Sequence, residues 1–160
     1  MLAFCRRFLP LLSLSLIAAS CSSGFRPTLD AANTVDSLAT VIIGDVTYPL
    51  KVVCYEVGND LTAVGVGTDS ATGKALKVYI HGPAGAYVGL IFGTDEYIYE
   101  PDANVELTIE RDGDRLLGSA ISFVRDIDLG SANGSPVGSG SVDVECASKR
   151  AGPPPTVSTR

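Results

Sequence analysis

The residues with the most distinctive chemistry in this sequence are its four cysteines, Cys5, Cys21, Cys54 and Cys146. Cys21 lies in the stretch IAASCSSG, residues 17–24, where small residues precede and follow the thiol. A cysteine in such a stretch either joins a disulfide or becomes the acylated N-terminus of a membrane-tethered chain. The choice between these two fates decides how the other cysteines are interpreted.

Residues 1–20 have the features of an export signal. Arg6 and Arg7 provide a basic start, and residues 8–19 form an apolar run that is shorter than the roughly 20 residues a membrane-spanning helix needs. We therefore expect this leader to be removed and the rest of the chain to be exported. Any membrane attachment must then come from another source.

Export changes the number of cysteines that remain. Cys5 is lost with the leader, and three are left, which is an odd number for a protein in an oxidising compartment. If Cys21 is acylated, Cys54 and Cys146 remain to form a disulfide. The alternative is an ordinary cleavage site, with Cys21 free or disulfide-bonded.

Other candidates for catalysis or metal binding are few. His81 is the only histidine, and the G-x-S-x-G nucleophile motif of esterases is missing from the sequence. The carboxylates of Asp95, Glu96, Glu100 and Asp102 cluster beside two tyrosines, and we interpret them as a solvated acidic loop rather than a cation site or a glycosidase pair. No C-x-x-C pair and no phosphate-binding loop is present, so we expect no enzyme activity, no metal and no cofactor.

The charge balance argues against two kinds of binding surface. The chain has a net charge of −6 and a pI near 4.6, which disfavours a nucleic-acid-binding surface and a polybasic membrane patch. Removing residues 1–20 takes away two of the 12 basic residues and none of the 18 acidic ones, so the exported chain has a net charge of −8.

Beyond residue 40, short β-branched and apolar runs alternate with turn residues, and no window shows the 3.6-residue period of a helix. We expect eight strands, over residues 40–44, 47–57, 61–66, 75–80, 86–92, 104–110, 116–124 and 141–146. Residues 67–74 and 130–140 are expected to be loops. The pattern predicts an all-β domain, a small antiparallel sandwich or barrel of about eight strands with one disulfide.

Strict alternation in two of these runs indicates which side chains face the core. The inward set is expected to comprise Val105, Leu107, Ile109, Val142, Val144 and Cys146. The domain boundaries follow: a signal peptide over 1–20, an acylated N-terminus and polar tether over 21–39, the β domain over 40–149, and a disordered Pro-rich tail over 150–160.

These features together resemble the mycobacterial 19 kDa lipoprotein antigen family. The resemblance covers residues 17–148 and is carried by the stretch around Cys21, by KVVCYEVGNDLTAVGVG with Cys54, by the loop DIDLGSANGSPV, and by the closing VDVECAS with Cys146. It implies that Cys21 is acylated and that Cys54 and Cys146 are disulfide-bonded. The tether is poorer in threonine than the family pattern, and the proline-rich tail is an extension of it.

The resemblance also implies a function. The protein would be a non-enzymatic surface antigen of an actinobacterial envelope, anchored by its acyl chains on the extracytoplasmic face of the cell membrane and recognised by host Toll-like receptor 2 mainly through those chains. An alternative is an envelope carrier with a lipid ligand inside the β domain, because the run AYVGLIF, residues 86–92, is apolar on both faces and the mean hydropathy is positive.

Overall fold

The computed structural model describes residues 36–94, 96–128 and 133–155. Within these ranges the chain forms ten strands and no helix. The strands are β1 (Ser37–Ile43), β2 (Val46–Val57), β3 (Asp60–Thr68), β4 (Ala75–Gly82), β5 (Tyr87–Phe92), β6 (Tyr97–Pro101), β7 (Ile109–Asp112), β8 (Arg115–Asp128), β9 (Asn133–Glu145) and β10 (Lys149–Ala151). Accordingly, the described ranges contain no helix able to cross a membrane.

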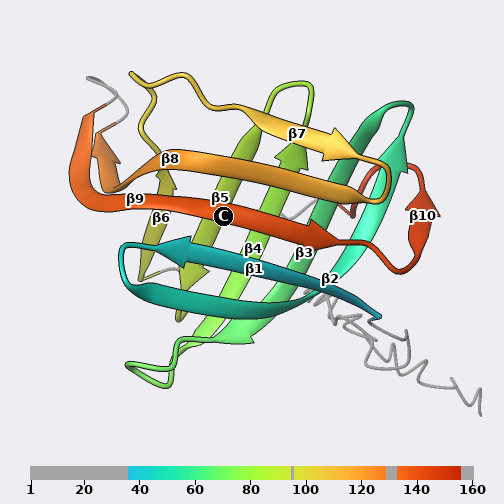
Figure 1. Ribbon diagram of the computed structural model, residues 1–160. Coiled ribbons are helices and arrows are strands. Elements are labelled where there is room, and N and C mark those ends of the chain that lie inside the picture. Colours follow the sequence, from blue (N-terminus) through green and yellow to red (C-terminus); the bar gives the residue numbers. More distant parts are fainter. Residues whose placement is uncertain (1–35, 95, 129–132, 156–160) are drawn as a thin grey trace, which may run out of the picture.

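Eight of the strands close into an antiparallel barrel (Figure 1). Neighbours in the ring follow the chain, in the order β1, β2, β3, β4, β5, β6, β8 and β9, and β1 pairs with both β2 and β9. The predicted fold, an all-β sandwich or barrel with one disulfide, is therefore confirmed, and the architecture is the barrel. Closure leaves no open sheet edge within the ring.

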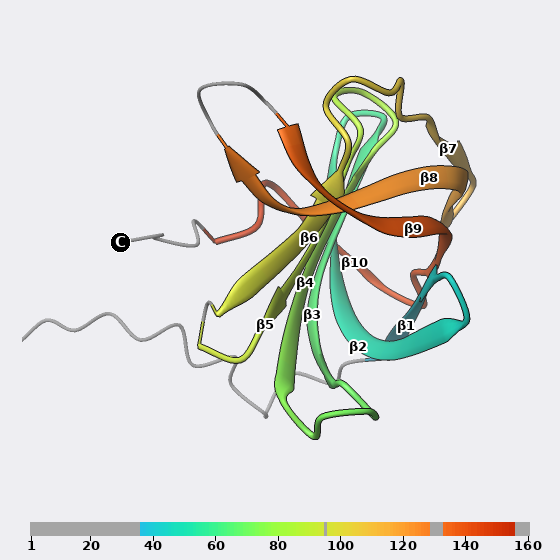
Figure 2. The same ribbon diagram turned by 90° about the vertical axis from the view of Figure 1, so that its left-hand side faces the viewer.

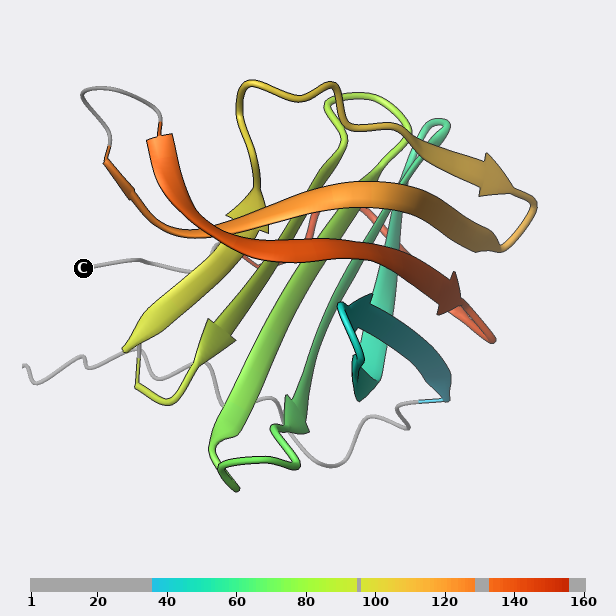
Figure 3. The same ribbon diagram turned by 60° about the vertical axis from the view of Figure 1, so that its left-hand side comes forward.

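Two strands lie outside the ring. β7 forms a hairpin with β8, and β6 lies along the same edge of β8 farther on, so β6 and β7 resemble the two halves of one interrupted strand. Figure 3 shows the connecting segment arching between them over one end of the barrel. The short β10 pairs in parallel with the end of β2, beyond the point where β1 stops.

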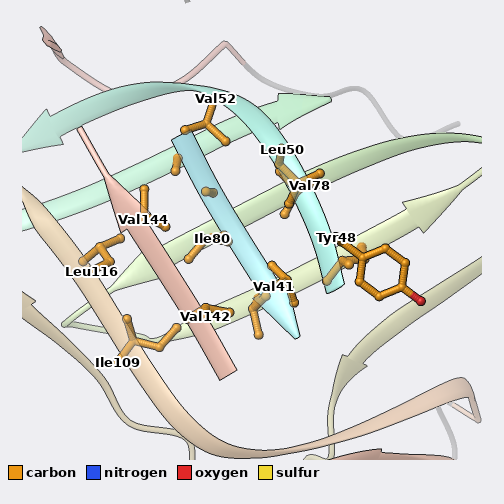
Figure 4. Packing of buried hydrophobic residues seen from close by; sticks show 14 of the residues in the cluster. Val41, Tyr48, Leu50, Val52, Val78, Ile80, Ile109, Leu116, Val142 and Val144 are labelled. Atoms are coloured by element: carbon orange, nitrogen blue, oxygen red, sulfur yellow. The ribbon is translucent and has the colours of Figure 1, made fainter. Parts of the chain in front are cut away.

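Inward-pointing side chains from every strand of the ring fill the barrel (Figure 4). The largest fully buried ones are Phe92, Phe123, Leu61, Leu76, Ile80, Leu90, Ile109 and Leu116. Strand alternation explains this packing, because every second residue of β1, β2 and β4 is buried and its neighbours point to solvent. The predicted core positions Ile109, Val142, Val144 and Cys146 are confirmed.

Two glycines allow the sheet to bend sharply enough to close. A Cβ on Gly65 would overlap the backbone carbonyl of Lys51 on β2, and one on Gly140 would overlap that of Ile42 on β1. Figure 2 shows β2 curving strongly past β3. Glycine at these places permits an approach between strands that no side chain would allow.

Some sequence-based expectations about strands were wrong. The predicted strand over 104–110 forms only from Ile109, and Val105, expected to face the core, is 48% exposed. The cause is a turn in which the Val105 amide donates to the Asp102 carbonyl at 3.0 Å. Leu107, in the same segment, is half-buried and packs against the core.

Other strands were not predicted, or were predicted to be shorter than they are. β6 occupies residues that we interpreted as an acidic loop, and β9 begins at Asn133, inside the loop expected over 130–140. β1 begins at Ser37, three residues before the expected strand, and β10 includes Arg150 and Ala151 of the expected tail. In β6, rich in Tyr and Glu, and in the first half of β9, rich in Gly and Ser, the composition hid a strand whose stability comes from its neighbours.

Candidate functional site

The disulfide holds one end of the barrel together. Cys54 lies on β2 and Cys146 directly follows β9, and their Sγ atoms are 2.00 Å apart. Both are buried, as an inward position on each strand requires. The bond joins an early strand to the last strand of the ring, and β10 then returns to lie beside Cys54.

A network of charged side chains surrounds this end. The Arg111 guanidinium donates to the Glu56 carboxylate and, at 2.9 Å, to the carbonyl of Asn59. Lys149 donates to Asp114 and lies 3.6 Å from Glu56. The network ties β7, the turn between β7 and β8, and β10 to the end of β2 and the turn that follows it.

The charges of this network shift the acidity of its members. The hydrogen bond from Arg111 and the nearby Lys149 ammonium hold the pKa of Glu56 below its ordinary value. The hydrogen bond from Lys149 lowers the pKa of Asp114 in the same way, and Asp114 in turn raises the pKa of Lys149. The Glu56 and Asp114 carboxylates are both paired with cations, and these pairs link the strands at this end of the barrel.

His81 lies on the outside of β4. Its Nδ1 is 2.8 Å from the hydroxyl oxygen of Thr62 on β3, and its ring packs near Tyr79. Among the described residues no carboxylate is hydrogen-bonded to His81. The arrangement that a hydrolase needs, a histidine between a nucleophile and an orienting carboxylate, is not assembled there.

The acidic residues of the predicted cluster are dispersed. Glu96 pairs with Lys74, Glu100 accepts a hydrogen bond from the Tyr87 hydroxyl, and Asp102 accepts from the amide of the following turn. Asp95 lies outside the described residues. In the part of the chain that the structure covers, no three His, Cys, Asp or Glu side chains come together to hold a metal ion.

The pair formed by Tyr87 and Glu100 is half-buried and lies on the outside of the barrel. The Tyr87 ring covers Gly89, its neighbour on the same face, and its hydroxyl reaches across to β6. Burial and the carboxylate both raise the pKa of Tyr87 well above its ordinary value. This tyrosine is therefore a neutral hydrogen-bond donor.

An aromatic cluster at the other end of the barrel was not anticipated from the sequence. Phe92 stacks on Tyr97 with ring centres 4.6 Å apart, and Tyr99 and Tyr48 lie 4.7 and 5.7 Å from the same ring. Burial, with the neighbouring tyrosines and Asp69, raises the pKa of Tyr48 to about 12. Figure 4 shows the Tyr48 hydroxyl pointing away from the aliphatic core. The spacing of Tyr97 and Tyr99, two residues apart, was the available signal for a strand with both rings on one face.

Two open depressions flank β7. One, of about 500 Å³, lies between β7 and the turns after β2 and β4, and is lined in part by Asn59, Pro83 and Arg111. The other, of about 420 Å³, lies over β8 and is lined in part by Leu117 and Ser141. Neither brings together a nucleophile, a base and an orienting group.

Cys21, the predicted lipidation site, lies outside the described residues. The described part of the chain contains the barrel and its disulfide. Acylation of Cys21 stays a prediction from the sequence. No family model, no curated protein and no solved structure matches this chain.

Proposed function

We propose that the protein is a lipid-anchored surface protein of an actinobacterial cell envelope, without enzymatic activity. Its attachment to the extracytoplasmic face of the cell membrane comes from acyl chains on Cys21. The observation that carries this proposal is the distribution of cysteines in the exported chain. Since Cys54 and Cys146 are bonded to each other, Cys21 has no cysteine partner left in its own chain.

The sequence around Cys21 supports acylation over a free thiol. Ala18, Ala19 and Ser20 precede it at the end of an apolar leader, as in a lipoprotein cleavage site. Each buried methylene contributes about 0.8 kcal/mol to membrane binding, and two acyl chains give stable anchoring. By its resemblance to the antigen family, the protein would be recognised by Toll-like receptor 2 through these chains.

The geometry of the β domain supports a non-enzymatic role. His81 has a hydroxyl partner and no carboxylate partner among the described residues, and the acidic side chains of the predicted cluster each have a separate partner. The packed barrel gives the carrier alternative less support. A lipid inside it would have to displace fully buried side chains such as Phe92 and Phe123.

The test of anchoring is the mass and the location of the exported chain. The intact mass of the mature protein is expected to exceed that of residues 21–160 by a diacylglyceryl group, and the protein is expected in the membrane fraction. Cys21→Ala should move it to the soluble fraction and abolish receptor activation. A double variant, Cys54→Ala with Cys146→Ala, should stay membrane-bound, and an unmodified thiol at Cys21 would contradict the proposal.

A further inference from the structure

We draw no further inference here: the strongest candidate, the open depression over β8 that is lined in part by Glu110, Ser119 and Asp143, has its Asp143 carboxylate already paired with Arg115, and nothing in the structure shows what covers it.

Discussion

At the level of single residues, the barrel depends on places where a side chain is absent. Gly140 on β9 lies so close to β1 that a Cβ would overlap the Ile42 carbonyl and come within 2.9 Å of the Phe123 ring. Gly65 on β3 is in the same situation, with Val52 at 2.7 Å. At each of them the neighbouring strand is the obstacle, so rotation of a side chain could not relieve an overlap.

Gly140→Ala is accordingly expected to destabilise the protein by about 2–4 kcal/mol, because β1 and β9 would have to move apart where the ring closes. Urea unfolding followed by far-UV circular dichroism measures the change. The control is Ser141→Ala, one residue along, whose side chain points outward. Equal stabilities for the two variants would show that the strands can separate at little cost.

Glu56 provides a prediction about pH. Its pKa is held below the ordinary value of 4.5 by Arg111 and Lys149, so its stabilising effect is present above that value and is lost as pH falls through the folded-state pKa. Glu56→Gln should therefore lower the urea midpoint at neutral pH. The gap between parent and variant should close in strong acid.

The matched control for this pH effect is Glu106→Gln, which alters an exposed carboxylate in the segment between β6 and β7. Its urea midpoint should follow that of the parent at every pH. A gap between parent and Glu56→Gln that persists below the folded-state pKa would mean that the side chain acts through packing rather than charge.

At the level of elements, the disulfide joins parts of the chain that are distant in sequence. Cys54 and Cys146 are 92 residues apart, and closing a loop of that length stabilises a protein by about 4–5 kcal/mol on the chain-entropy model. Replacing both with alanine should lower the free energy of unfolding by about 3–5 kcal/mol. Urea titration in the presence and absence of a thiol reductant measures it.

The same titration contains its own control. A reductant should destabilise the parent and leave the double alanine variant unchanged. A parent that unfolds at the same urea concentration with and without its disulfide, once reduction is confirmed by thiol labelling, would contradict the entropic account.

Some strands and their inward positions could be predicted from the sequence, and others could not. Strict alternation located the end of β9 and the inward positions Val142 and Val144, because one face of that strand is buried. The same alternation was misleading at Val105, where an Asp102 turn interrupts the strand. The first half of β9 could not be predicted from its Gly, Ser and Pro residues, because pairing with β8 supplies what its own composition lacks.

Of the candidate site, only the disulfide could be predicted, because the number and positions of the cysteines are visible in the sequence. The pairing of Cys54 with Cys146 followed from counting cysteines by compartment, and it is confirmed. The network around Glu56 and Arg111 could not be predicted, since these residues are 55 positions apart and meet only in the closed barrel. Acylation of Cys21 stays a prediction.

At the level of the whole molecule, closure and charge define the sides of the barrel. Alternating strands are compatible with a sandwich and with a barrel, and the contact that decides between them, the pairing of β1 with β9, joins segments about 100 residues apart. Closure then sorts the outward residues by strand, so that the outward residues of the run from Ala75 to Phe92, which contains no Asp or Glu, share one side of the barrel. The absence of Asp and Glu from this segment is visible in the sequence. Only the folded barrel shows which of its residues lie on the same outer side.

The position of Ser37 has a mechanical consequence. It pairs with Val52 at the start of β1, its hydroxyl accepts a hydrogen bond from the Ala147 amide at 3.1 Å, and the adjoining Cys146 is covalently bound to Cys54. A pulling force applied through the preceding residues therefore arrives at the most heavily cross-linked point of the barrel. It would have to shear β1 from β2 and β9 at once, and these two strands are held to each other by the disulfide. We therefore expect the barrel to resist unfolding when it is pulled through its N-terminal segment.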